Sequence, residues 1–183
     1  MATSSFTSHS CSADEYARQT LTVDFLFLDR ERCERCAETE RNLETALERI
    51  DPILSDLGME VILRRVHVQT PEDARRTRLE ISPTVRIDGR AVQPAGPATT
   101  CESCSACADG EGDIDCREWL YRGEAHAAAP VELLVEAVLE GAFTPSWVDG
   151  PLAQETYTLP ENLASFFGED EGASECGCEC GCG

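Results

Sequence analysis

The hydrophobic pattern of the chain begins with Leu21–Leu28, a nearly continuous apolar run that is rich in β-forming residues. Such a run is typical of a central strand that is covered on both faces. Helical spacing follows, with apolar residues at Leu43, Ala46, Leu47, Ile50, Ile53, Leu54 and Leu57. This spacing predicts a helix with one buried face, kinked or restarted at Pro52 and ended by Gly58.

The next segments predict a second strand, a short helix and a hairpin. Residues 59–68 have the composition of a strand, and Thr70-Pro71 supplies the N-cap and first residue of a helix that runs to about Leu79. Asp88-Gly89 is a strong signal for a tight hairpin. The two strands that flank it are expected at Thr84–Ile87 and Arg90–Val92.

A last helix is expected over Pro130–Leu139, stopped by Gly141. A strand, a crossover helix, a parallel strand, an antiparallel hairpin and a closing helix together predict an α/β fold, arranged as a three-layer sandwich. A cysteine-rich insertion at about residues 95–125 interrupts this order, and Trp119 and Tyr121 are expected to anchor it on the core. A short helix begun by Pro160 is expected to dock on the domain.

The length suits one domain with appendages. We expect the domain over residues 21–167, a disordered N-terminal arm over residues 1–20 and a disordered acidic tail over residues 168–183. No apolar signal sequence or membrane span is recognisable, so we expect a cytoplasmic protein.

The charge of the chain is strongly negative. There are 35 acidic and 15 basic residues, all the basic ones are arginines, and the formal net charge is −20. An acidic surface without lysine is typical of proteins that stay hydrated in concentrated salt, which favours a halophilic source over the alternative of a GC-rich genome. Nucleic acids and anionic membranes are excluded as partners by this charge.

Cys33-Glu34-Arg35-Cys36 lies between the first strand and the first helix. There the helix dipole and the free backbone N–H groups favour a thiolate at the first cysteine. The motif predicts a dithiol in which Cys33 attacks a disulfide and Cys36 resolves the mixed intermediate, without a cofactor. The alternative is that this pair is half of a zinc site.

The dithiol together with Ser82-Pro83-Thr84 resembles the thioredoxin-like superfamily, although Arg32 and Glu34-Arg35 replace its usual Trp and Gly-Pro. The resemblance implies a thioredoxin-like sandwich in which Pro83 is cis and packs against the dithiol; a trans proline at the start of a strand is the alternative. More closely, the chain resembles a prokaryotic, haloarchaeal-looking thioredoxin-like family known only as a domain of unknown function. The stretches that carry this resemblance are 33–36, 82–89, 115–119 and 160–163.

The insertion carries four cysteines, Cys101, Cys104, Cys107 and Cys116. It contains few apolar residues, and a tetrahedral Zn²⁺ site formed by these four thiolates would supply its folding free energy. An iron–sulfur cluster fits the spacing less well because the proline that often follows such a run is missing. Two disulfides or free thiols are further alternatives, and the insertion is also able to fold back near Cys33 and pass electrons or a soft ion to it.

The acidic tail ends in alternating cysteines with glycine spacers, at Cys176, Cys178, Cys180 and Cys182. This pattern suits thiophilic ions such as zinc, copper, mercury or arsenic, although the tail thiols are equally able to act only as oxidant scavengers. Two functions follow from the sequence. The first is a thiol–disulfide oxidoreductase with protein or low-molecular-weight disulfides as partners, and the second is a protein that binds and transfers soft metal or metalloid ions.

Overall fold

The computed structural model describes residues 19–108, 113–144 and 156–169. It has a mixed α/β architecture, as the sequence predicts. The central sheet has the strand order β2-β1-β3-β4, with bounds β1 Gln19–Phe27, β2 Met59–His67, β3 Thr84–Ile87 and β4 Arg90–Ala91. β1 runs parallel to β2 and antiparallel to β3, and β3 pairs antiparallel with β4. The helices are α1 Glu34–Asp56, α2 Pro71–Thr77, α3 Glu102–Ser105, α4 Val131–Phe143 and α5 Glu161–Phe166.

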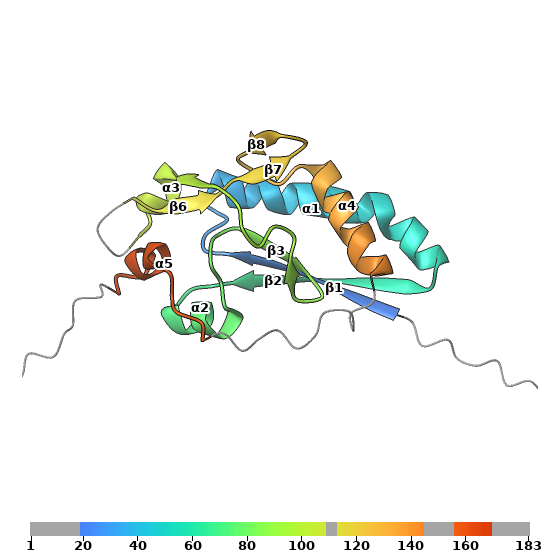
Figure 1. Cartoon of the computed structure of the whole chain (residues 1–183), viewed down its shortest axis with the longest axis horizontal. Coiled ribbons are helices and arrows are strands. Elements are labelled where there is room, and N and C mark those ends of the chain that lie inside the picture. Colours follow the sequence, from blue (N-terminus) through green and yellow to red (C-terminus); the bar gives the residue numbers. More distant parts are fainter. Residues whose placement is uncertain (1–18, 109–112, 145–155, 170–183) are drawn as a thin grey trace, which may run out of the picture.

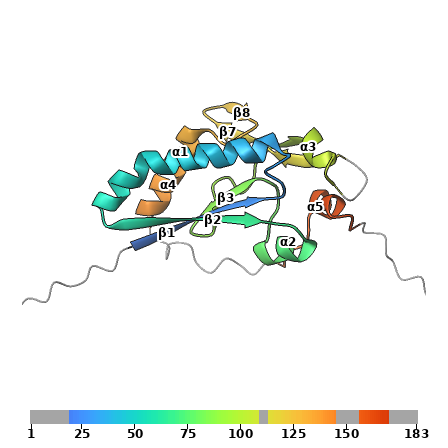
Figure 2. The same ribbon diagram turned by 180° about the vertical axis from the view of Figure 1, so that it is seen from behind.

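Helices cover both faces of the sheet (Figures 1 and 2). α1 and α4 pack together on one face, and α2 and α5 pack together on the other. The larger hydrophobic core fills the space under α1 and α4 and includes Phe25, Leu43 and Leu134. A smaller core under α2 and α5 includes Leu79 and Leu163. The central position of β1 between these cores explains its continuous apolar sequence.

Three local predictions are confirmed. The hydroxyl oxygen of Thr70 accepts a hydrogen bond of 3.1 Å from the backbone N–H of Asp73, which caps α2. The turn between β3 and β4 has Asp88 and Gly89 at φ values of 47° and 84°, as a two-residue hairpin turn requires. Trp119 is completely buried and joins the larger core, so it anchors the insertion.

Two expected helix boundaries are absent. α1 is one helix from Glu34 to Asp56 and does not restart at Pro52, whose missing N–H removes only the one hydrogen bond to the carbonyl of Glu48. α4 continues through Gly141 to Phe143. Gly141 lies against Ile87 of β3, and a Cβ placed on it would meet the Ile87 Cγ2 at 2.3 Å. The glycine is therefore required by helix-to-sheet packing and not by helix termination.

The insertion forms small elements of its own beside the sheet. β5 Ala98–Thr100 pairs with β6 Asp115–Arg117, and β7 Trp119–Tyr121 forms a hairpin with β8 Glu124–His126. α3 and β6 lie at the end of the molecule where β1 ends and α1 begins (Figure 1). The topology therefore brings the insertion to the start of α1, where the sequence places the dithiol.

Candidate functional site

The site begins in the loop between β1 and α1. The Asp29 carboxylate accepts hydrogen bonds from the backbone N–H groups of Glu31 and Arg32, at 2.8 and 2.9 Å, and this turns the chain into the helix. Cys33 is the N-cap residue of α1, and Cys36 lies in the first turn. Both side chains are buried, with 1% and 0% of their surface exposed. A dithiol at a strand-to-helix junction is thus present, but it is covered.

Arg35 joins the start of α1 to the insertion that covers it. Its guanidinium donates to the Thr99 hydroxyl at 2.8 Å and to the backbone carbonyl of Thr100 at 3.3 Å, both on β5. It also reaches the backbone carbonyl of Cys116 on β6 at 3.5 Å. One arginine therefore fixes both strands of the β5–β6 ribbon relative to the helix that carries Cys33.

Arg117 holds the other side of the ribbon to the sheet. Its buried guanidinium donates to the backbone carbonyl of Pro83 at 3.0 Å and to the Thr84 hydroxyl at 3.1 Å, and it also donates to the carbonyl of Gln93. It lies over the ring of Trp119, with its central carbon 5.3 Å from the ring centroid. Burial lowers the pKa of Arg117 from its ordinary value, and the surrounding carbonyl oxygens satisfy its N–H donors.

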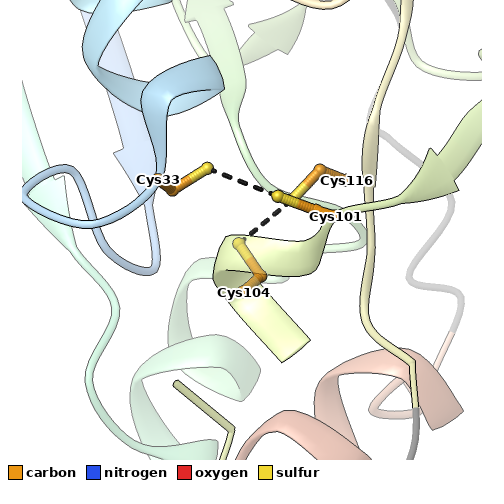
Figure 3. Close-up of side chains that lie close together, drawn as sticks. All are labelled: Cys33, Cys101, Cys104 and Cys116. Carbon is orange, nitrogen blue, oxygen red and sulfur yellow. Dashed lines mark hydrogen bonds between the residues drawn. The ribbon is translucent and has the colours of Figure 1, made fainter. Parts of the chain in front are cut away.

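Four cysteine sulfurs meet between the start of α1 and the insertion (Figure 3). They belong to Cys33, Cys101, Cys104 and Cys116, all four are buried, and all lie within 4.8 Å of one another. The Sγ atoms of Cys33 and Cys101 are 3.8 Å apart, and those of Cys104 and Cys116 are 3.1 Å apart. We call this group the four-cysteine cluster.

The dimensions of the cluster fit a single tetrahedral ion. Four sulfurs at about 2.3 Å from a central Zn²⁺ lie about 3.8 Å from one another. The Cys33 and Cys101 sulfurs have this spacing, and the Cys104 and Cys116 sulfurs are closer, at 3.1 Å. An iron–sulfur cubane puts four iron atoms between the ligands and holds the thiolates farther apart, so it fits less well. The ligands are all sulfur, which favours soft ions over Mg²⁺ or Ca²⁺.

The cluster differs from the ligand set expected within the insertion. Cys101, Cys104 and Cys116 come together as expected, but the fourth sulfur is that of Cys33. Cys107 is partly exposed, and its sulfur accepts a hydrogen bond of 3.7 Å from the Arg32 guanidinium. α3 is short, and its turn places Cys104 inward, whereas Cys107 follows after the helix ends. The tail cysteines Cys176, Cys178, Cys180 and Cys182 lie outside the described residues, as does Cys11.

Cys36 lies next to the cluster but is not one of its four members. Its sulfur is 3.5 Å from the Ser82 hydroxyl, which in turn accepts a hydrogen bond of 3.2 Å from the backbone N–H of Leu28. The Ser82–Pro83 peptide bond is cis, the isomer that the thioredoxin resemblance implies. Cys33, Cys36 and Pro83 therefore lie at one end of the sheet together with the insertion.

Hydrogen bonds among the thiols concentrate negative charge on Cys33. The bonds from Cys104 and then from Cys116 and Cys36 lower the pKa of the Cys33 thiol, against the effect of burial. Donation to Cys33, followed by burial, raises the pKa of Cys36. The bond with Cys104 is the main cause that raises the pKa of Cys116, with the bond to Cys33 and burial adding to it.

The pKa of the Cys104 thiol is also raised, as the net result of opposing effects. Its hydrogen bond with Cys116 lowers its pKa, but its bond to Cys33 and its burial together outweigh that effect, so the pKa is raised. A bound divalent ion supplies the positive charge that lets the remaining ligands lose their protons.

Comparison with known proteins places these residues in a family. The family model described as "Domain of unknown function (DUF2703)" matches residues 21–138. The chain belongs to this family. The matched segment of the DUF2703 domain contains the whole four-cysteine cluster, Cys36 and Pro83. The prediction of a family described as a domain of unknown function is thus confirmed.

The chain is also similar to an archaeal protein. An "Uncharacterized protein" of Archaeoglobus fulgidus is 37% identical over 101 residues, which are 53% of this chain and 69% of that protein. No solved structure matches the chain. Within the described parts of the DUF2703 protein, no helix is both long and apolar enough to cross a membrane.

Sequence reasoning missed the residues that assemble the site. Arg35 and Arg117 each follow or lie beside a cysteine, but nothing in the hydrophobic pattern distinguishes them from surface arginines. Ser82 was visible only as part of the Ser-Pro-Thr motif. The approach of the insertion to Cys33 was one of the alternatives open from the sequence, because the cysteine-rich segment directly follows the β3–β4 hairpin, and the structure confirms it.

Proposed function

We propose that the DUF2703 domain is a thioredoxin-like protein that binds one thiophilic metal ion, with Zn²⁺ as the first candidate, through Cys33, Cys101, Cys104 and Cys116. The strand order β2-β1-β3-β4 and the dithiol at the start of α1 support the thioredoxin-like assignment. The observation that carries the metal site is the approach of four buried sulfurs to within 4.8 Å of one another. Four thiols that converge from two separate segments supply a complete ligand set for one soft ion, whose binding free energy would stabilise this arrangement.

The use of Cys33 distinguishes this site from a local staple of the insertion. A staple would need only the four insertion cysteines, whereas here the ligands come from α1, α3 and β6. The ion therefore occupies the nucleophilic cysteine of the dithiol. This favours a protein that holds and transfers a soft ion, and thiophilic ions are its proposed partners.

Metal counting on the reduced protein tests this function. The background is the full chain with Cys11 and the four tail cysteines replaced by serine, so that only the six described cysteines bind. This protein is expected to bind one Zn²⁺, and Co²⁺ in its place is expected to give the absorption of a tetrahedral tetrathiolate site. Cys33→Ser is expected to weaken Zn²⁺ binding by at least about 100-fold, measured by competition with a chromophoric chelator.

Cys107→Ser is the matched control, since it also removes one thiol near the cluster. It is expected to leave the affinity and the Co²⁺ spectrum unchanged. If Cys107→Ser abolishes binding while Cys33→Ser does not, the ligands are the four insertion cysteines and the proposed site is wrong.

Thiol–disulfide exchange is a second candidate function, favoured by the position of Cys33 at the N-cap of α1 with Cys36 one turn away. Against it as the only function, the insertion leaves just 1% of Cys33 exposed. The metal-free background protein should reduce a low-molecular-weight disulfide catalytically if this function is correct. Cys33→Ser should then abolish turnover, and turnover that persists in Cys33→Ser would exclude the dithiol as its source.

A further inference from the structure

Cys33 has two sets of cysteine neighbours. The first is the three insertion cysteines of the four-cysteine cluster. The second is Cys36, which lies three residues further along in the first turn of α1, is fully buried and remains outside the cluster. Since a sulfur in a disulfide is a far poorer ligand than a thiolate, a bond between Cys33 and Cys36 takes Cys33 away from a metal ion.

We propose that Cys33 alternates between the metal ion and a disulfide with Cys36, so that a low-molecular-weight disulfide drives release of the ion. This inference rests on the proposed metal-binding function and adds to it the signal that unloads the site. The observation that carries this inference is that the buried Cys36 thiol lies next to Cys33, which also belongs to the complete set of four buried cysteines.

Cys36 is held in the position of a resolving thiol. Its sulfur is 3.5 Å from the hydroxyl of Ser82, and that hydroxyl oxygen already accepts the backbone N–H of Leu28. The hydroxyl proton of Ser82 is therefore free to be donated to the Cys36 sulfur. This contact fixes the Cys36 side chain between the start of α1 and the loop before β3, next to Cys33.

The exchange balances in two steps. The Cys33 thiolate attacks a disulfide RSSR, which forms the mixed disulfide Cys33–S–S–R and releases RS⁻. The Cys36 sulfur then attacks Cys33, which breaks the mixed bond and releases the second R group as RSH with the proton of Cys36. Two electrons pass from the two cysteine sulfurs to RSSR, and the ion loses one of its four ligands.

The remaining ligands hold the ion poorly. Cys101, Cys104 and Cys116 leave one coordination position open after Cys33 departs. Among the described residues, no histidine or carboxylate belongs to the cluster and could take the vacant position. Cys107 is the nearest substitute in sequence, and its partly exposed sulfur is engaged by Arg32.

The burial of Cys33 and Cys36 limits the size of the disulfide that is able to react with them. Cys33 and Cys36 are 1% and 0% exposed, and the β5–β6 ribbon that covers them is fixed by Arg35 and Arg117. A small disulfide needs only a limited displacement of this cover to reach Cys33, whereas a disulfide within a folded protein needs the cover removed. The natural oxidant is therefore expected to be of low molecular weight.

Zinc release measured alongside disulfide mapping tests the proposal. The full chain with Cys11 and the tail cysteines replaced by serine is loaded with one Zn²⁺ and treated with hydroxyethyl disulfide under anaerobic conditions. A chromophoric chelator follows the released zinc, and peptide mass mapping identifies the disulfide. We expect one Zn²⁺ released for each Cys33–Cys36 disulfide formed.

Cys36→Ser preserves all four ligands and removes only the resolving thiol. It is expected to bind one Zn²⁺ but to release it at least about tenfold more slowly, whereas Cys107→Ser should behave like the parent protein. Release from Cys36→Ser at the parent rate, a Cys104–Cys116 link, or a Cys33–Cys36 disulfide with zinc still bound would each overturn the proposal. If Cys36→Ser does not fold, the mapped disulfide and zinc stoichiometry of the parent protein decide alone.

The two proposals fail in different ways. A reduced parent protein that binds no Zn²⁺ before any oxidant is added contradicts the metal-binding function itself. A protein that binds one Zn²⁺ but keeps it through oxidation contradicts only the release.

Discussion

Arg35 is expected to influence the proposed metal site without binding the ion. Its hydrogen bonds to Thr99 and Thr100 hold the insertion cysteines against the start of α1. Outer contacts of this kind orient the ligands, and their loss typically weakens metal binding by about 10- to 100-fold. Arg35→Met keeps most of the apolar side chain and removes these donors.

We predict that Arg35→Met weakens Zn²⁺ binding by about tenfold without changing the number of ions bound. The dissociation constant from chelator competition gives the affinity, and the Co²⁺ spectrum checks that four thiolates still bind. Arg41→Met, at an exposed position of the same helix, is the control and should leave the affinity unchanged. Equal affinities for Arg35→Met and the parent protein would show that the insertion is positioned without Arg35.

At the scale of single residues, the sequence predicted which cysteines form thiol sites better than it predicted which cysteines lie next to one another. Cysteine spacing identified both the dithiol and the insertion as thiol sites, because their chemistry is carried by residue type. The sequence did not predict that Cys33 takes the place of Cys107 in the cluster. Cys33 and Cys101 are 68 residues apart, and the local spacing of cysteines does not determine whether such distant residues meet. Asp24, the one charged residue of the apolar run Leu21–Leu28, pairs with Arg64 across the β1–β2 register, at 2.8 Å.

Among the elements, α4 depends on one close approach to the sheet. Gly141 allows the helix to lie directly on Ile87 of β3. Alanine normally stabilises a helix relative to glycine by about 0.5 to 1 kcal/mol, but here its Cβ would overlap the isoleucine side chain. The overlap forces α4 away from the sheet or displaces Ile87, at a cost of about 1 to 3 kcal/mol.

We therefore predict that Gly141→Ala lowers the free energy of unfolding by about 1 to 2 kcal/mol. Urea denaturation at a fixed free Zn²⁺ concentration measures this change. In a protein that already carries Ile87→Ala, Gly141→Ala should lower the free energy of unfolding by less than it does in the parent protein, because the clashing Cγ2 is gone. A purely additive pair of substitutions would mean that the contact with Ile87 does not limit this position.

The elements themselves were predictable wherever local chemistry determines them. The β3–β4 hairpin follows from Asp88-Gly89, and the start of α2 follows from Thr70. Pro52 and Gly141 both disfavour helices when judged alone, yet both lie inside helices. At Gly141 the close contact with Ile87 requires a residue without a side chain, and the sequence gives no sign of this contact.

The charge of the whole molecule predicts how its stability depends on salt. A net charge of −20 produces repulsion across the surface, which is screened when the Debye length falls from about 30 Å at 0.01 M to about 3 Å at 1 M ionic strength. The surface ion pairs are screened too, but exposed pairs contribute little to stability. The repulsion between carboxylates is therefore expected to dominate.

We predict that the melting temperature of the zinc-loaded protein rises by about 5 °C between 0.01 and 1 M NaCl. Differential scanning calorimetry measures the rise, and an equal rise in KCl identifies screening as its cause. A fall in melting temperature would indicate instead that ion pairs such as Arg65 with Glu40 outweigh the net repulsion.

The distance along the chain between Cys33 and the other three cysteines has a consequence for the order of folding. Before the chain folds, Cys107 meets Cys101 and Cys104 more readily than Cys33 does, because short loops close at the least entropic cost. An ion that arrives early is captured by this local set, and its binding to the unfolded chain cancels part of the stability it gives the native state. Cys33 arrives only when α1 has packed on the sheet, and it must then displace Cys107. The proposed ion would thus stabilise the folded protein but slow its folding. We therefore expect a chain that folds before it is loaded with the ion to reach the native state faster.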